Sequence, residues 1–222
     1  MTIQEYFGDW SEVLDLKEAD RIIRKLSASS HTVCPPVRDI FKAFRMCPLS
    51  RLRVVILCQD PYPQKGVATG IALANCQGTE RLSPSLEVLR ESVIDYTIPH
   101  GRINFDSSLE KWEAQGVLML NSALSCEAGK TGSHTLLWMP FIRTLLTRLS
   151  CYQTGIVYVL MGTVAQSFSP CINRQSNHVI HIRHPSFYAR TGSAMPSDIW
   201  REINTILIGQ NGYGIEWYQE ES

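Results

Sequence analysis

The sequence of 222 residues predicts one α/β domain, a three-layer α/β/α sandwich with a central four-stranded parallel sheet. Three observations lead to this prediction. Four short runs are rich in valine, isoleucine and leucine, which is typical of strands buried on both faces of a sheet. Segments with helical spacing of apolar residues separate these runs, so each strand is expected to lie parallel to its neighbour. Each run also ends in polar residues, glycine or proline, at the end where open α/β sheets carry their ligand sites.

The first half of the chain is expected to supply one strand and four helices. The helical pattern covers residues 16–26 and 38–45, both ahead of the first strand. That strand spans residues 53–58, whose apolar run is uninterrupted after its first residue. Residues 85–96 and 107–115 follow with helical spacing of their apolar side chains, and they are expected to cover the sheet.

The second half is expected to supply the other three strands and two helices. The strands span residues 117–121, 156–161 and 178–183. Residues 138–149 carry apolar side chains at positions 138, 141, 142, 145, 146 and 149, which form one stripe along a helix. Pro140 is expected in the first turn of this helix, where its missing N–H removes no hydrogen bond. Residues 197–208 are expected to form the last helix.

Chemically distinctive residues follow three of these strands. Asp60 comes after the first strand, Asn121 ends the second, and His184 follows the fourth. Because the carboxyl ends of parallel strands share one edge of a sheet, these side chains are expected to converge although they are far apart in sequence. Each also has a structural alternative: an aspartate can cap a turn, an asparagine can bond the backbone, and a histidine can be a satisfied core residue.

Composition and absent motifs exclude several classes of protein. The chain has no GxSxG nucleophile elbow, no phosphate-binding P-loop and no GxGxxG dinucleotide fingerprint. Its seven cysteines form no CxxC pair and no metal-ligand cluster, so they are expected to be reduced structural thiols. A net charge of zero argues against binding nucleic acid through bulk charge, but it is compatible with a local basic surface. The absence of a signal peptide and of an apolar run of about 20 residues argues against a membrane and favours the cytoplasm, or the nucleus of a eukaryotic or viral host.

Several motifs along nearly the whole chain resemble those of the family 1 uracil-DNA glycosylases, in the same order and spacing. They are QDPY at 59–62, GIAL at 70–73, LMLNS at 118–122, SH at 133–134, VLMG at 159–162 and HPS at 184–186. The resemblance implies the fold predicted above. It also implies hydrolysis of the N-glycosidic bond between uracil and deoxyribose in single- or double-stranded DNA, without a metal or other cofactor.

The resemblance assigns catalytic roles to Asp60 and His184. The target nucleotide must first be flipped into a pocket, because its bond is inaccessible inside a duplex. Bond breaking then leaves positive charge on the sugar and negative charge on the base. A carboxylate at Asp60 would stabilise the sugar and orient the attacking water, and a hydrogen-bond donor at His184 would stabilise the uracil oxygen.

The resemblance assigns base-binding roles to Gln59, Tyr62, Leu73 and Asn121. The carboxamide of Asn121 can accept from uracil N3–H and donate to O4, a pairing that cytosine cannot match. Tyr62 would stand where the 5-methyl group of thymine must lie and would exclude it by steric clash. The backbone of Gln59 would help to hold the base, and Leu73 would contact its face.

The contacts to the DNA strand are assigned to Ser85, Ser186, Tyr188 and Arg190. Short hydroxyl side chains and backbone N–H groups can position phosphates without reading the base sequence. A local basic rim is expected from Arg190 together with Lys65, Lys130 and Arg183.

Three positions depart from the family pattern. Pro63 replaces the histidine that usually follows the tyrosine, as it does in the poxviral branch, whose members also serve DNA-polymerase processivity. Leu73 replaces the phenylalanine that stacks on uracil, and stacking contributes about 1–3 kcal/mol per base. The segment after Ser186 lacks the family's wedge leucine, so Tyr188 or Phe187 would fill the vacated base stack.

The sequence therefore predicts a monomeric, monofunctional uracil-DNA glycosylase of base-excision repair. Two alternatives stay open: a DNA-binding or replication-processivity scaffold with weak or no excision, which Pro63 suggests, and a glycosylase with altered base specificity, which Leu73 suggests. A protein inhibitor or a replication protein would be further partners. His134 either helps the site or braces the loop that leads to Trp138.

Overall fold

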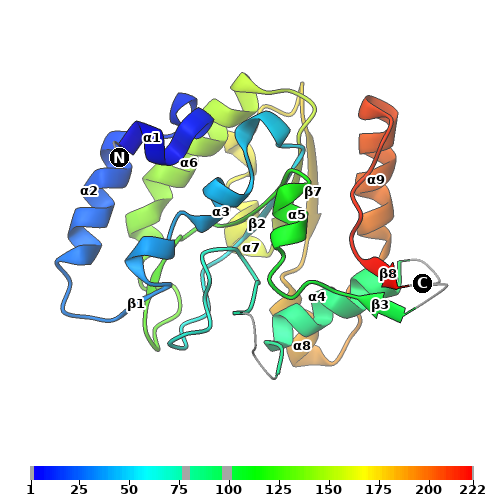
Figure 1. The fold of residues 1–222 in the computed structure, drawn as a ribbon, viewed down its shortest axis with the longest axis horizontal. Coiled ribbons are helices and arrows are strands. Elements are labelled where there is room, and N and C mark those ends of the chain that lie inside the picture. Colours follow the sequence, from blue (N-terminus) through cyan, green and yellow to red (C-terminus); the bar gives the residue numbers. More distant parts are fainter. Residues whose placement is uncertain (1–2, 77–80, 97–101, 222) are drawn as a thin grey trace.

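The computed structural model describes residues 3–76, 81–96 and 102–221, and a parallel sheet of four strands forms its centre (Figure 1). The strands are β2 (Val54–Cys58), β4 (Val117–Asn121), β6 (Val157–Met161) and β7 (His178–Ile182). Their order across the sheet is β4-β2-β6-β7, and Val54 lies opposite both Val117 and Val157. The predicted strands and the predicted parallel sheet are confirmed, with boundaries that differ by at most one residue.

Helices cover the sheet on both sides, with α2 and α6 on one side in Figure 1 and α9 on the other. The α-helices within the described residues are α1 (Ile3–Phe7), α2 (Leu16–Ser27), α3 (Lys42–Met46), α4 (Pro84–Ile94), α5 (Glu110–Ala114), α6 (Thr135–Tyr152), α7 (Thr163–Gln166), α8 (Pro185–Thr191) and α9 (Asp198–Asn211). The predicted α/β/α class is confirmed. The short helices α1, α7 and α8 were not predicted from the sequence; α7 and α8 directly follow strands β6 and β7.

Two predicted helices are shorter in the structure because polar side chains and backbone geometry interrupt them. The segment expected at 38–45 divides into a 3₁₀ helix, Val37–Asp39, and α3. The segment expected to start at 107 begins at Glu110, because Leu109 has a φ of 55° and cannot continue a right-handed helix. The Asp106 carboxylate accepts from the backbone N–H groups of Ser108 and Lys111, and so caps the shortened helix.

Helix α6 is longer than the sequence pattern predicts. It begins at Thr135, three residues earlier than expected, so Pro140 lies in its second turn. The prediction that Pro140 lies in the first turn is therefore wrong. Because proline has no N–H, the carbonyl of Leu136 lacks the helical hydrogen bond that residue 140 would otherwise donate.

Burial across the sheet is asymmetric. Every residue of β2, β4 and β6 is buried, as their unbroken apolar sequences predict. The prediction that β7 is buried is wrong, because β7 is an edge strand and none of its residues is fully buried. Strand β4 forms the opposite edge but is covered, because α3 and α5 pack against it.

A small antiparallel ladder supports the segment that follows β2. Strand β1 (Val33–Cys34) pairs with β5 (Cys126–Glu127), and Cys34 lies directly opposite Cys126. The Cys34 thiol contacts the carbonyl of Pro63 at 3.7 Å, and the Cys126 thiol contacts the carbonyl of Pro61 at 3.6 Å. The two thiols therefore contact the carbonyls of both prolines and support the turn between them.

A second ladder joins β3 (Arg102–Asn104) to β8 (Gln219–Glu221). All five tryptophans of the chain are buried, and the rings of Trp112, Trp200 and Trp217 pack against one another. This packing anchors the last segment of the chain, and the indole N–H of Trp112 donates to the carbonyl of Trp217 at 2.9 Å. Across the described ranges, none of the helices has the combination of length and apolarity that crossing a bilayer requires.

Candidate active site

The carboxyl edge of the parallel sheet carries a cavity of about 180 Å³. The predicted residues on its wall are Gln59, Asp60, Tyr62, Leu73, Ser85, Asn121, His184 and Ser186. The structure therefore brings together side chains from segments far apart in sequence, as the parallel sheet predicts. The cavity is smaller than the roughly 300–1,000 Å³ of pockets for drug-sized ligands, so it suits a single small ring.

Asp60 lies just beyond β2 and faces the cavity. The backbone N–H of Gly132, 72 positions further along the chain, donates to its Oδ2 at 2.8 Å. Burial raises the pKa of the Asp60 carboxyl, while the hydrogen bond from Gly132 acts in the opposite direction. The Asp60 carboxylate is thus held in position by Gly132 and is partly removed from solvent. It can accept a proton from a water molecule.

His184 lies at the N-cap of α8, and its ring is oriented by the residue two positions on. Its Nδ1 accepts from the backbone N–H of Ser186 at 3.2 Å and lies 2.9 Å from the Ser186 hydroxyl. Burial, with a further contribution from the positive charge of Arg190, lowers the pKa of His184 to about 4. A neutral imidazole that accepts at Nδ1 carries its proton on Nε2, so His184 is a neutral hydrogen-bond donor.

The end of β6 leaves room for this histidine only because residue 162 is glycine. A Cβ built on Gly162 would lie 3.0 Å from the Cβ of His184, and the residue has a φ of 88°. An L-residue at this position would be strained and would push the histidine from its place. Gly162 therefore helps to set the position of His184.

Asn121 ends β4 with its side chain almost fully buried, at 8% exposure, on the cavity wall. Its place is secured by the next residues, because Ser122 Oγ and the N–H of Ala123 both donate to the carbonyl of Gln59, at 2.8 and 2.9 Å. Within the described residues, no group bonds the Asn121 carboxamide. Its polar atoms stay accessible from the cavity, so the carboxamide is available to pair with a ligand.

Tyr62 and Leu73 also line the cavity. The Tyr62 hydroxyl donates to the Leu73 carbonyl at 3.0 Å, which joins the two segments. Leu73 is buried and has a φ of 64°, a left-handed conformation that costs an L-residue about 1–2 kcal/mol. Strain of this kind persists only where surrounding contacts impose it, and it concentrates at functional sites.

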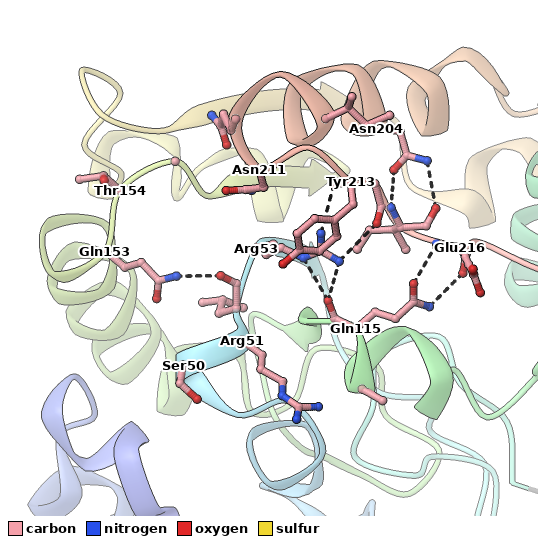
Figure 2. A pocket seen from close by; sticks show the side chains of 17 residues that line it. Ser50, Arg51, Arg53, Gln115, Gln153, Thr154, Asn204, Asn211, Tyr213 and Glu216 are labelled. Atoms are coloured by element: carbon pink, nitrogen blue, oxygen red, sulfur yellow. Dashed lines mark hydrogen bonds between the residues drawn. The ribbon is translucent and has the colours of Figure 1, made fainter.

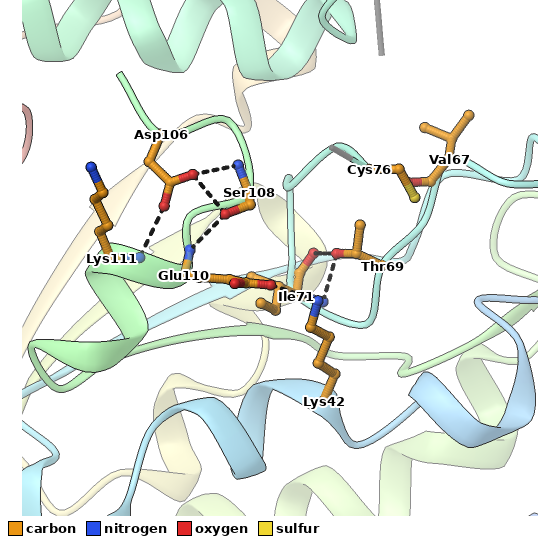
Figure 3. Close-up of polar contacts among 9 residues, drawn as sticks. All are labelled: Lys42, Val67, Thr69, Ile71, Cys76, Asp106, Ser108, Glu110 and Lys111. Atoms are coloured by element: carbon orange, nitrogen blue, oxygen red, sulfur yellow. Dashed lines mark hydrogen bonds and ion pairs between the residues drawn. The ribbon is translucent and has the colours of Figure 1, made fainter. Parts of the chain in front are cut away.

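Those contacts fix the loop before Leu73 to the helices beside it. A Cβ on Gly70 would lie 1.9 Å from the carbonyl oxygen of Asp39, so only glycine permits this approach. Thr69 Oγ1 accepts from the N–H of Ile71 at 3.2 Å, and Figure 3 shows this contact next to Lys42. Lys42 itself pairs with Glu110 at 2.8 Å and so ties α3 to α5 beneath the loop (Figure 3).

The two predicted serines lie in the first turns of α4 and α8, which pack against each other. Ser85 is buried at 7% exposure, and Ser186 is half-buried beside His184. Both line the cavity, so their hydroxyls and the adjacent helix N-termini mark one rim. Arg190 is exposed on α8, outside the wall.

Tyr188 does not lie where the sequence analysis expected a wedge. Its side chain is buried at 8% exposure and belongs to the hydrophobic core, because α8 turns that face inward. The prediction of an accessible Tyr188 is therefore corrected. Its neighbour Phe187 is half-buried, and the guanidinium of Arg183 lies 4.3 Å from its ring centroid.

His134 lies off the cavity wall and takes part in a buried hydrogen-bond chain. Trp138 Nε1 donates to Ser125 Oγ at 2.9 Å, and that hydroxyl lies 2.9 Å from His134 Nδ1. Burial lowers the pKa of His134, which agrees with a neutral ring that accepts from the serine. Of the two roles left open by the sequence, this geometry matches the brace of the loop before α6.

Residues 131 and 132, beside Asp60, contribute to the site but were not predicted from the sequence. Gly132 orients the carboxylate and Thr131 lines the wall. The only local signal was the pair of glycines at 129 and 132, both with positive φ, just before the SH motif. Across the described residues, no group of three or more His, Cys, Asp or Glu side chains has the arrangement of a metal site.

Comparisons with known proteins agree with this geometry. The sequence model of the uracil DNA glycosylase superfamily matches residues 44–208. A uracil-DNA glycosylase of Vibrio campbellii is 33% identical over 221 residues, which span 97% of this chain and 91% of that protein. One of Yersinia pestis is 31% identical over 219 residues, spanning 98% and 95%. The crystal structure of a mimivirus UNG variant in complex with UGI has a TM-score of 0.80 at 21% identity, spanning 98% of this chain and 88% of that one, a likeness of fold.

Proposed function

The chain belongs to the uracil DNA glycosylase superfamily, and on this premise we propose that it excises uracil from DNA. It is a monofunctional enzyme that hydrolyses the N-glycosidic bond and leaves an abasic site and free uracil, a step of base-excision repair. The observation that carries this proposal is the single small cavity in which Asp60, Asn121 and His184 meet.

The size of the cavity explains why the base must leave the duplex. A hollow of about 180 Å³ admits one ring but not a stacked base pair. Extrusion of the nucleotide costs a few kcal/mol, and contacts with the pocket offset this cost. The wall therefore binds a flipped nucleotide, with its sugar at the mouth and its base inside.

Asp60 and His184 act on opposite sides of the breaking bond. As the bond lengthens, the sugar becomes positive, and the Asp60 carboxylate stabilises this charge and accepts a proton from the attacking water. The negative charge that develops on the base is stabilised by the Nε2–H of His184, which Ser186 orients through Nδ1. A preorganised donor of this kind contributes about 3–4 kcal/mol to transition-state stabilisation.

Base selection rests on the unpaired carboxamide and on the aromatic wall. Asn121 accepts from uracil N3–H and donates to O4, which satisfies its buried amide. Tyr62, held by its bond to the Leu73 carbonyl, leaves no space for a 5-methyl group. Leu73 supplies apolar contact to the face of the base, and the backbone of Gln59 holds its edge.

The DNA strand is held at the rim rather than by bulk charge. Ser85 and Ser186 face the flanking phosphates from two helix N-termini, which favour anions. Arg190 adds a positive charge outside the wall. Phe187, rather than the buried Tyr188, is the aromatic side chain that enters the base stack.

The remaining assignments are part of the same proposal. The chain acts as one domain and as a monomer, wherever uracil-containing DNA lies, in the cytoplasm or in the nucleus of a eukaryotic or viral host. A protein inhibitor is a further partner, since the mimivirus UNG variant binds UGI. A replication-scaffold role is supported only by Pro63.

The test is excision from a labelled oligonucleotide with one uracil, single- and double-stranded, beside otherwise identical thymine and cytosine strands. Strand cleavage at the abasic site only in the uracil substrates is the expected result. A folded protein that yields no product at high concentration would overturn the proposal. Addition of UGI to the active reaction tests the inhibitor partner separately.

A further inference from the structure

Thr131 lines the cavity beside Asp60, and the assigned catalytic, base-binding and DNA contacts do not involve it. It directly precedes Gly132, whose N–H donates to Asp60 Oδ2 at 2.8 Å. Thr131 and Asp60 share the same cavity wall. Because Thr131 is the neighbour of Gly132 in the chain, this hydrogen bond also keeps Thr131 near the carboxylate that activates water.

The hydroxyl of Thr131 is available, whereas those of Tyr62 and Ser186 on the same wall are committed and that of Ser85 lies at the start of α4, on the rim. Tyr62 donates to the Leu73 carbonyl, and the Ser186 hydroxyl contacts His184 Nδ1. Thr131 is exposed, and its hydroxyl bonds no group within the described residues. It is thus free to bond a molecule in the cavity.

Pro63 also lines the cavity, close to Asp60 in the sequence. Pro63 has no side-chain donor or acceptor, and its carbonyl already accepts from the N–H of Gly129 at 2.9 Å. A water held by one acceptor alone can rotate about that hydrogen bond. A second acceptor fixes the direction of its lone pair, and orientation of this kind is a large part of catalysis.

We propose that Thr131 Oγ1 is the second hydrogen-bond partner of the water that Asp60 activates, an inference that rests on the proposed function and deepens it. The water donates one hydrogen to the Asp60 carboxylate and the other to Thr131 Oγ1. Its oxygen forms the new bond to C1′ of the sugar, and the C1′–N1 bond breaks with its electron pair passing to uracil. Asp60 takes the proton released by the water, and Thr131 keeps its own.

The test compares Thr131→Val, which removes the hydroxyl at nearly constant shape, with Thr131→Ser, which retains it. On a single-stranded uracil oligonucleotide, Thr131→Val is expected to lower kcat about tenfold, the value of one hydrogen bond to the reacting water, with KM unchanged. Thr131→Ser is expected to restore kcat to near the wild-type value. Thr147→Val is the matched control, because Thr147 is exposed on α6 and off the cavity wall.

A second comparison uses Asp60→Asn as the background. Because both groups hold one water, Thr131→Val should cost much less than about tenfold once the carboxylate is gone. An additive loss overturns the inference. So does an unchanged kcat in Thr131→Val, a loss confined to KM, or a Thr131→Ser variant as slow as Thr131→Val.

Failure of the proposed function and failure of this inference alone give different results. A wild-type protein that releases no uracil overturns the proposed function together with this inference. An active wild-type protein with an unaffected Thr131→Val variant overturns the inference alone. Equal melting temperatures of the wild type and both Thr131 variants show that the compared rates belong to folded enzymes.

Discussion

The two edges of the parallel sheet each carry a hollow, and the two differ in size and in chemistry. The cavity at the carboxyl edge measures about 180 Å³, while a groove at the amino edge measures about 1,080 Å³ (Figure 2). The groove is lined by residues that precede β2, β4 and β6, together with the end of α9 and the segment after it. Volume alone would therefore point to the wrong edge.

Polar groups in the large groove satisfy one another. The guanidinium of Arg53 donates to the carbonyls of Gln115, Tyr213 and Gly214, and it lies 4.4 Å from the Tyr213 ring centroid (Figure 2). Asn204 exchanges two hydrogen bonds with the backbone of Ile215. These bonds join α9 and the segment that follows it to the sheet, so the groove serves the fold.

Polar groups in the small cavity are held in place, but two of them keep atoms that bond no other described group. Asn121 has an unbonded carboxamide, and His184 uses Nδ1 for the fold while Nε2 stays available. A few polar groups that converge on a cavity and stay free to bond are typical of a ligand site. The comparison teaches that such convergent polar groups at the carboxyl edge mark the site better than volume does.

The largest expected effect comes from Asp60→Asn. The amide cannot accept a proton from water or stabilise a positive sugar, so the excision rate should fall about a thousandfold. Its size and its contact with the Gly132 N–H are retained, so the melting temperature should change little. Single-turnover release of uracil measures the rate. A variant as fast as the wild type would show that the carboxyl edge takes no part in the chemistry.

His184→Ala is expected to lower the rate a few hundredfold, the equivalent of about 3–4 kcal/mol, because it removes a preorganised donor. It should also flatten the pH dependence of stability. The pKa of His184 falls from 6.5 to about 4 on folding, so between these values the unfolded chain binds a proton that the folded chain does not. Wild-type stability should therefore drop as pH falls through that window. Melting curves of the wild type and the variant at several pH values test this. An equal fall in stability of the two proteins between pH 6.5 and about 4 would contradict it.

Tyr62→Ala is expected to relax base selection. Without the ring, a 5-methyl group fits the cavity, so discrimination against thymine should fall about tenfold or more. Tyr62→Phe is the control: it keeps the ring and removes only the hydroxyl that bonds the Leu73 carbonyl. Parallel assays on uracil and thymine strands give the ratio. Thymine release by the phenylalanine variant as well would show that the hydroxyl, not the ring, excludes the methyl group.

The smallest effect on activity is expected at the amino edge. Arg53→Met leaves several carbonyls unpaired, so the free energy of unfolding should fall by about 1–3 kcal/mol while kcat stays unchanged. Arg51→Met, at an exposed neighbouring side chain, should change neither quantity. Chemical denaturation measures the stability of both variants, and excision assays measure their kcat. Together they distinguish a structural role of the amino edge from a catalytic role of the carboxyl edge. A loss of kcat in a folded Arg53→Met enzyme would contradict the division between them.

Much of the carboxyl edge could be predicted because local patterns and fold class decide it. The buried runs set three of the strands, and parallel connection brings Asp60, Asn121 and His184 to one edge. The family assignment from the motifs is confirmed by the comparisons. The predictions failed where packing outweighed local pattern, as at the exposed edge strand β7 and at the buried Tyr188.

By itself, the sequence determined the α/β class, the order of the strands along the chain and the residue types at their ends, because hydrophobic period and turn residues act over a few positions. Only the tertiary structure decided how those residues work. The tautomer of His184 follows from the Ser186 N–H, and the orientation of Asp60 follows from Gly132. The unpaired state of Asn121 also depends on which segments meet at the edge. These properties arise from contacts formed only in the folded chain, several of them between distant segments, and no local pattern specifies them.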